Sequence, residues 1–185
     1  KNKNKIFIGM FTTALNLEDG DVNDVESHLG FLLFAKDLLT KNDDYRIIIK
    51  TKYNITNIID KNVFPEITNA LSELNNSGKV MFIYNYPRAS ILINKCDITI
   101  SMPFTSSLPE AIVQNKKSFF LDINNNFEKS YYEKFNYLIA HNSQQGFKFL
   151  DHWINVNESD FKKYSLSFKE DFGISKILNS TDLIK

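Results

Sequence analysis

The amino-acid sequence predicts an α/β domain in which helices cover both faces of a doubly wound, mostly parallel sheet of five to six strands. Short runs rich in Ile, Val and Phe alternate with longer stretches whose apolar residues recur at helical spacing, about five times along the chain. The run over Arg46–Lys50 is almost continuously apolar, which is typical of a strand that is buried on both faces. Alternation of this kind favours parallel strands joined by helical crossovers.

The expected strands follow one another at regular intervals. In chain order they cover Ile6–Phe11, Arg46–Lys50, Val80–Tyr84, Asp97–Ser101, Ser118–Asp122 and, as a short sixth strand, Gly146–Leu150. Each is brief, rich in β-branched or aromatic residues, and flanked by polar or turn-forming residues.

Helices are expected between these strands. Apolar residues recur at helical spacing over residues 22–40, and Pro65 fits the first position of a second helix that ends before Gly78. The other expected helices cover Pro87–Asn94, Ser107–Asn115, the stretch from Phe127 to Leu138, and segments near 158–165 and 173–179.

Length and composition limit the class of protein. The 185 residues are predicted to form a single domain over 1–185, with the tail from about 150 folding as C-terminal helices. Hydrophobic residues make up 43% and charged residues 24%, as in globular proteins. Because 22 Lys and Arg balance 22 Asp and Glu, no nucleic-acid partner is expected.

Cysteine content and hydropathy predict a cytoplasmic location. The single cysteine, Cys96, excludes a disulfide framework and fits a reducing compartment. No apolar run approaches the roughly 18 residues that a membrane span needs, so the expected contact with a membrane is at most peripheral, at its inner face. The sequence does not begin with Met, and we expect it to be a piece of a longer protein.

The residues that follow the strands are the first candidates for a ligand site, because open parallel sheets bind ligands at the carboxyl ends of their strands. They are rich in hydroxyl, amide and lysine groups, and they comprise Thr12, Thr13, Lys50–Lys52, Tyr84, Asn85, Ser101–Ser107 and Asp122–Asn124. This composition suits a phosphorylated or hydroxylated ligand better than a metal ion or a nucleophilic triad.

The stretch Ser101–Glu110 is the most informative, because it joins an expected strand to an expected helix. Thr105, Ser106 and Ser107 lie where a helix start leaves free N–H groups, which favour a phosphate. Glu110, one turn further, could accept hydrogen bonds from a ribose diol. The alternative interpretation is a capping box, in which Ser107 and Glu110 satisfy the helix end by themselves.

Other polar motifs have simpler explanations. Lys50 and Lys52 could reach a phosphate, although exposed lysines are common on protein surfaces. The acidic turn Glu18-Asp19-Gly20 could clamp a ligand, or could be an ordinary turn. The three histidines are not at metal-binding spacing, and no metal or other cofactor is expected. The sequence contains no Gly-rich phosphate loop and no Gly-x-Ser-x-Gly nucleophile motif.

Residues Cys96–Ile112 and Lys117–Asp122 resemble the C-terminal, donor-binding half of GT-B glycosyltransferases, above all bacterial enzymes that build surface polysaccharides. In that family a strand with an Asp near its start leads into a serine-rich turn, a helix with a Glu-Ala pair, and a strand ending in Asp. The order of elements agrees from residue 6 to about 179. One departure is the stretch Lys50–Tyr53, which lacks the His-Pro pair that often follows this family's second strand.

The resemblance implies a nucleotide-activated sugar, CMP- or UDP-linked, as the donor. Its binding site would comprise Lys50, Tyr84, Thr105, Ser106, Ser107 and Glu110. Ser106 and Ser107 would hold the donor phosphate, Glu110 a ribose hydroxyl, and Lys50 would add positive charge. The glycan acceptor would bind to a missing N-terminal domain or a partner subunit, and no catalytic residue is assigned. A non-catalytic nucleotide- or partner-binding module, or half of a sugar-nucleotide epimerase, remains an alternative on the same fold.

Overall fold

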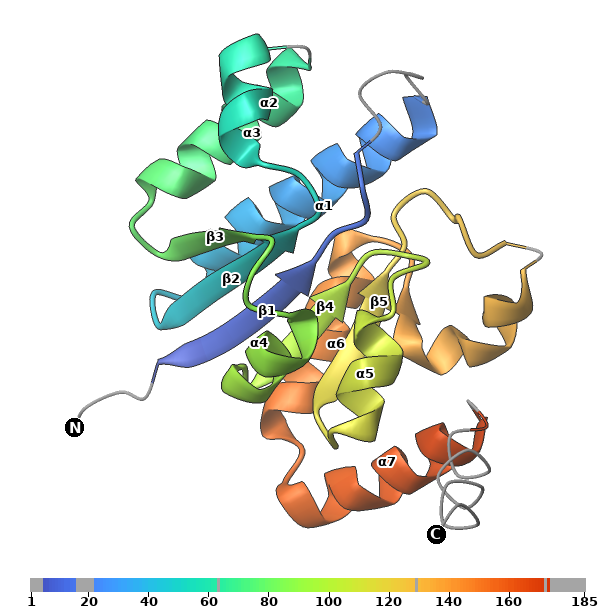
Figure 1. Ribbon diagram of the computed structural model, residues 1–185. Helices are drawn as coiled ribbons and strands as arrows, with labels where there is room; N and C mark the ends of the chain where they lie inside the picture. The colour runs from blue at the N-terminus through green and yellow to red at the C-terminus, as the bar shows by residue number, and fades with distance from the viewer. Residues whose placement is uncertain (1–4, 16–21, 63, 129, 172, 174–185) are drawn as a thin grey trace, which may run out of the picture.

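The computed structural model describes residues 5–15, 22–62, 64–128, 130–171 and 173, and shows one six-stranded sheet (Figure 1). The strand order is β3-β2-β1-β4-β5-β6, and every neighbouring pair is parallel. The strands are β1 (Ile6–Phe11), β2 (Tyr45–Thr51), β3 (Val80–Tyr84), β4 (Ile98–Ser101), β5 (Lys117–Leu121) and β6 (Ile139–Ala140). The predicted α/β class, with a doubly wound parallel sheet, is confirmed.

Helices cover both faces of the sheet, and Figure 1 shows α4 and α5 in front of it with α1 and α6 behind. The helices are α1 (Val22–Lys41), α2 (Ile55–Lys61), α3 (Pro65–Asn76), α4 (Ala89–Lys95), α5 (Ser107–Val113), α6 (Ser143–Asn155) and α7 (Glu158–Asp171), with the 3₁₀ helix η1 (Tyr131–Leu138) before β6. The short helix α2 follows β2 directly and was not predicted. Its N-terminus is capped by Asn54, whose side chain accepts a hydrogen bond from the N–H of Thr56.

The larger core lies mostly behind the sheet, where α1, α3 and α6 pack against alternate strand residues, and it extends to residues of α5 and α7. Ile8 and Met10 of the central strand β1 are fully buried there. On the front face, Phe11 packs with Leu92 of α4 and Ala111 of α5 in a smaller cluster. Because both faces of the sheet are buried, the strands are almost continuously apolar in the amino-acid sequence.

The prediction for the sixth strand was wrong. Residues 146–150 lie inside α6, and β6 is the two-residue strand Ile139–Ala140. In the structure Gly146, Leu150 and Trp153 lie on the buried face of this helix. Asn142 determines where the helix begins, because its side chain accepts a hydrogen bond from the N–H of Gln145.

Two further differences concern the C-terminal half. The stretch expected to be helical from Phe127 begins only at Tyr131 and forms a 3₁₀ helix, because residues 122–127 form a turn around Asp122. The helix α7 extends beyond the predicted 158–165, to Asp171. The segment expected to be helical over 173–179 lies, except for Gly173, outside the described residues.

Gly9 provides a test of the packing at the centre of the sheet. A Cβ at this position would lie 2.8 Å from Cys96 Sγ, 3.1 Å from Phe11 Cε2 and 3.3 Å from Thr99 Cγ2. We expect Gly9→Ala to lower the free energy of unfolding by about 2 kcal/mol, because overpacking forces these neighbours to move. Urea denaturation measures the loss.

The control is Cys96→Ala, which removes the closest atom. Gly9→Ala combined with Cys96→Ala should lose less stability than the sum of the two single losses. Strict additivity would contradict the predicted contact. The thiol itself is chemically quiet, since burial raises the pKa of Cys96 to about 12.

Candidate ligand site at the carboxyl edge of the sheet

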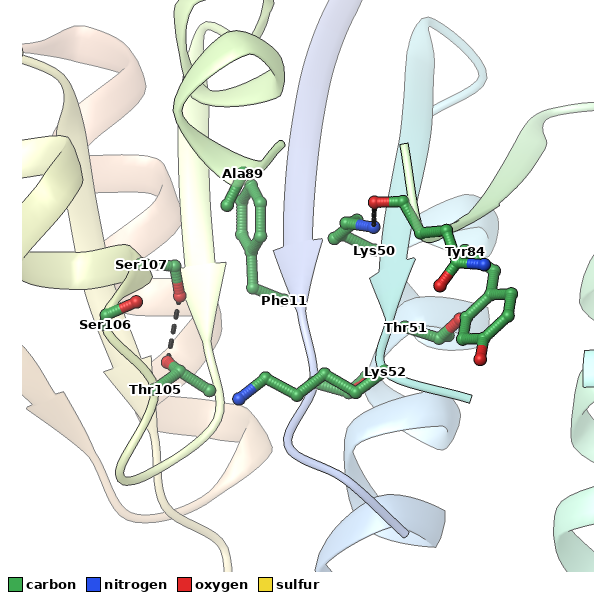
Figure 2. A pocket seen from close by; sticks show the side chains of 11 residues that line it. Phe11, Lys50, Thr51, Lys52, Tyr84, Ala89, Thr105, Ser106 and Ser107 are labelled. Carbon is green, nitrogen blue, oxygen red and sulfur yellow. Dashed lines mark hydrogen bonds between the residues drawn. The ribbon is translucent and has the colours of Figure 1, made fainter. Parts of the chain in front are cut away.

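A cavity of about 300 Å³ lies at the carboxyl ends of β1, β2 and β3, beside the loop between β4 and α5 (Figure 2). It is called the first cavity below. Its lining residues are Phe11, Thr12, Lys50, Thr51, Lys52, Tyr84, Asn85, Ala89, Thr105, Ser106 and Ser107. Strand register brings them together, because Phe11 pairs with Lys50 on one side and with Ser101 on the other. The site is where an open parallel sheet is expected to bind its ligand.

Five of the six predicted donor-site residues line this cavity. They are Lys50, Tyr84, Thr105, Ser106 and Ser107. The sixth, Glu110, does not line it, and its Oε1 accepts a hydrogen bond from Ser106 Oγ at 2.8 Å. Phe11 and Ala89 line the cavity but were not among the sequence candidates. Both are apolar, so the rule that selects polar residues after strands could not find them.

Two lysines supply the charge of the first cavity, and none of the lining residues in the described part of the chain is acidic. Lys50 Nζ donates a hydrogen bond to the backbone oxygen of Asn85 at 2.6 Å, which fixes its position without neutralising its charge. Burial lowers the pKa of Lys50 from its ordinary value. Lys52 is exposed, and Figure 2 shows its side chain extending past the end of β1 toward Thr105.

The hydroxyls of the loop before α5 are not equally available to a ligand. Thr105 Oγ1 donates to the backbone oxygen of Met102 at 2.9 Å, and Ser107 Oγ donates to Thr105 Oγ1 at 2.9 Å. Ser107 Oγ also lies 2.8 Å from Ser101 Oγ. Thr105 and Ser107 are only 8% and 3% exposed, whereas Ser106 is exposed. Ser106 is therefore the hydroxyl of this loop that a ligand can reach most directly.

The capping box considered for Ser107 and Glu110 is not formed. Ser106 holds the N-cap position and makes no side-chain hydrogen bond to the helix backbone, while Ser107 is already the first residue of α5. The hydroxyl of Ser107 is used by its buried neighbours, and Glu110 bonds to Ser106 instead. The capping-box interpretation of Ser107 and Glu110 is therefore wrong for α5.

Thr12 contributes an unpaired group to the first cavity. It is 3% exposed, and its side-chain oxygen is buried without a hydrogen-bond partner. Leaving a buried hydroxyl unpaired costs on the order of 1–3 kcal/mol, so such a group calls for an explanation. A bound ligand with polar oxygens would supply the missing partner.

Tyr84 lines the cavity and is 43% exposed, so its ring offers a flat apolar surface to a ligand.

The acidic turn Glu18-Asp19-Gly20 lies outside the described residues. Within the described part of the chain, no three His, Cys, Asp or Glu side chains are grouped closely enough to hold a metal ion. The described helices include none with the length and hydropathy of a membrane span.

Two solved structures of similar fold are a CMP-Kdo binding domain and an O-GlcNAc transferase. The C-terminal CMP-Kdo binding domain of WaaA from Acinetobacter baumannii has a TM-score of 0.51 and 12% identity, covering 90% of this chain and 87% of that domain. A mutant O-GlcNAc transferase from Thermobaculum terrenum has a TM-score of 0.52 and 12% identity. There the match covers 94% of this chain but only 36% of the other protein. The resemblance to half of a GT-B glycosyltransferase is thus confirmed for the fold.

No curated protein sequence is significantly similar to this chain. A protein family does match it, over residues 26–153, which is more than half of the chain. The family is described by a PFTS motif, and these letters are the one-letter codes of Pro103-Phe104-Thr105-Ser106, the loop that borders the first cavity. The chain therefore belongs to the family of polysaccharide biosynthesis PFTS motif proteins.

Proposed function

We propose that the first cavity binds the nucleotide and phosphate portion of an activated sugar, and that the chain is the donor-binding part of a glycosyltransferase. The observation that carries this proposal is the convergence of two lysine ammonium groups, an exposed serine and an unpaired buried hydroxyl on one cavity. Phosphate oxygens accept hydrogen bonds from each of these groups. Among the described residues, the lining carries two positive charges and no carboxylate, which favours an anion there. The Glu110 carboxylate lies beside the lining and is hydrogen-bonded to Ser106.

The positions of the predicted residues around the first cavity suggest a separate role for each. Lys50 and Lys52 would contact the phosphate, and Ser106 would donate a hydrogen bond to it. Thr105 and Ser107 would hold the loop in shape through their buried hydroxyls. Tyr84 would pack against the nucleoside. Glu110 would act through Ser106, or would receive a ribose hydroxyl once Ser106 turns toward the ligand.

In such a transfer the bond between the sugar's anomeric carbon and the donor phosphate breaks, and the nucleotide leaves with the electron pair. The oxygen of an acceptor hydroxyl forms the new bond to the anomeric carbon, and its proton passes to a base on the domain or subunit that completes the active site. The two lysines would stabilise the negative charge that grows on the leaving phosphate, so the proposal requires no metal ion.

The product would be a bacterial capsule, lipopolysaccharide or related glycan. An N-terminal domain or a partner subunit would complete the active site, in the cytoplasm or at the inner face of the membrane.

A thermal-shift panel with CMP, CDP, UMP, UDP, GDP and ADP tests this proposal. CMP comes first because the WaaA domain of similar fold is a CMP-Kdo binding domain. A nucleotide at about 100 times its dissociation constant stabilises a protein by roughly 2.7 kcal/mol, which is several degrees for a chain of this size. We expect one base to give the largest shift.

Ser106→Ala should reduce that shift, with about tenfold weaker binding, because a hydrogen bond to a charged group is lost. The matched control is Ser167→Ala, at an exposed position on α7 away from the cavity. If no nucleotide stabilises the chain, the donor-site proposal is wrong and a partner-binding module becomes the better interpretation. Conversion of a free UDP-sugar without an acceptor would instead indicate an epimerase half.

A further inference from the structure

A second cavity, of about 290 Å³, opens at the same edge of the sheet, beyond the ends of β5 and β6. It is called the second cavity below. Its lining residues are Asn125, Phe127, Glu128, Glu133, Asn136 and His141. They come from the turn after β5, from η1, and from the residue that follows β6. None of them was predicted as a site residue. The sequence analysis selected polar residues directly after expected strands, and these residues lie further along the turn, in η1 or after a strand that was not predicted.

Among the described lining residues, the charge of the second cavity is opposite to that of the first. Glu128 and Glu133 are the formally charged lining residues, and both are exposed. In the described part of the chain, neither carboxylate lies within ion-pair distance of a cation. Like charges repel, so these two carboxylates disfavour a phosphate in the second cavity. They attract neutral hydroxyl donors and amines.

His141, a partly buried residue of this lining, also carries an unpaired atom. Its backbone N–H is bonded to Gln145 Oε1 at 2.8 Å, but its ring Nδ1 is buried without a hydrogen-bond partner. A neutral imidazole has one nitrogen that donates and one that accepts. A hydroxyl can satisfy either nitrogen, because it both donates and accepts. Together with two carboxylates and two side-chain amides, the imidazole makes a lining suited to a hydroxyl-rich ligand.

The loop Pro103–Ser106 lies between the two cavities. Thr105 lines the first cavity, and the ring of the preceding Phe104 packs edge-on against Phe127 of the second, with centroids 4.9 Å apart. Phe104 is 59% exposed and has a φ of +59°, a left-handed conformation that is rare and strained for a bulky residue. Strain of this kind is tolerated mainly where it serves a site. Here it holds an aromatic ring at the surface between the cavities.

We propose that the second cavity binds a neutral or amine-bearing sugar residue of the acceptor glycan. Glu128 and Glu133 would accept hydrogen bonds from sugar hydroxyls, the amides of Asn125 and Asn136 would donate, and the exposed ring of Phe104 would pack against the C–H groups of the sugar. Part of the acceptor site then lies on this chain, next to the donor cavity. The acceptor role rests on the proposed transferase function, whereas the binding of sugar does not.

The experiment is a titration of the isotope-labelled chain, followed through its backbone amide NMR signals. The probes are neutral hexoses, N-acetylhexosamines, free hexosamines, uronic acids and hexose phosphates, each up to the hundred-millimolar range. We expect at least one neutral or amino sugar to shift the signals of Glu128, Glu133 and Asn136. Uronic acids and hexose phosphates should leave these three signals in place.

Glu133→Gln keeps the shape of the side chain and removes its charge. It should weaken the binding of that sugar about tenfold, as expected for the loss of a hydrogen bond to a charged group. Glu66→Gln on the distant helix α3 is the matched control and should change nothing. If no neutral or amino sugar shifts these signals, or if acidic sugars bind more tightly, the proposal is overturned.

The nucleotide panel, run on the same variants, separates this proposal from the proposed function. Glu133→Gln should retain the nucleotide shift, and Ser106→Ala should retain the sugar shift. Sugar binding without any nucleotide binding would support the second cavity and overturn its acceptor role, making the chain a glycan-binding module. Nucleotide binding without sugar binding would leave the donor site standing and remove the second cavity from the mechanism.

Discussion

Replacing Lys50 and Lys52 together with glutamine is expected to weaken nucleotide binding about 100-fold or more. Each ammonium can make a charge-assisted hydrogen bond to phosphate that is worth roughly 1.5–3 kcal/mol. Among the described residues, the two lysines are the only charged ones that line the first cavity, so no other described lining group can take over their role. Titration calorimetry with the nucleotide that stabilises the chain best measures the effect.

The charge-matched control is Lys61→Gln with Lys95→Gln, which removes the same charge from exposed ends of α2 and α4. Binding by the control should stay within twofold of the original chain, after allowing for a small long-range effect that salt screens. An equal loss in both double variants would show that net charge, and not the geometry of this cavity, governs binding. Retained affinity in Lys50→Gln with Lys52→Gln would place the nucleotide elsewhere.

Asp122→Ala is expected to lower the free energy of unfolding by about 3 kcal/mol. Asp122 is completely buried, and its carboxylate accepts hydrogen bonds from the backbone N–H of Asn126 at 2.7 Å and of Phe127 at 2.9 Å. The Asn126 side-chain amide adds a third, at 3.0 Å. Removing the acceptor leaves these donors in a place that water reaches poorly, and each buried unpaired donor is costly. Chemical denaturation measures the change.

The same substitution should also disturb the second cavity, because the turn held by Asp122 carries Asn125, Phe127 and Glu128. Asp60→Ala, at an exposed position of α2, is the control and should change stability by less than about 0.5 kcal/mol. If Asp122→Ala were as mild as this control, the turn would not depend on the carboxylate. The NMR signals of the first cavity should move less than those of the second.

The sequence was sufficient for the parts of the fold that local patterns determine. The strand over Val80–Tyr84 has the predicted bounds, and Pro65 begins α3 as expected, because a proline fits the first turn of a helix. The general rule for parallel sheets located the candidate site at the ends of the strands and brought Lys50, Tyr84 and Ser106 to one cavity. Their role as donor-site residues stays a prediction.

The tertiary structure alone decided how the polar groups are used. A hydroxyl bonds to whatever lies nearest in space, so the orientation of Ser107 depends on Ser101, a residue of a neighbouring element, and not on its spacing from Glu110. The second cavity likewise combines residues from the turn after β5, from η1 and from the end of β6, none of which shares a periodic pattern with the others. Sequence periodicity determines which face of a strand or helix is buried, because that depends on local geometry. The partners of a polar side chain depend on distant segments that come together only when the chain folds.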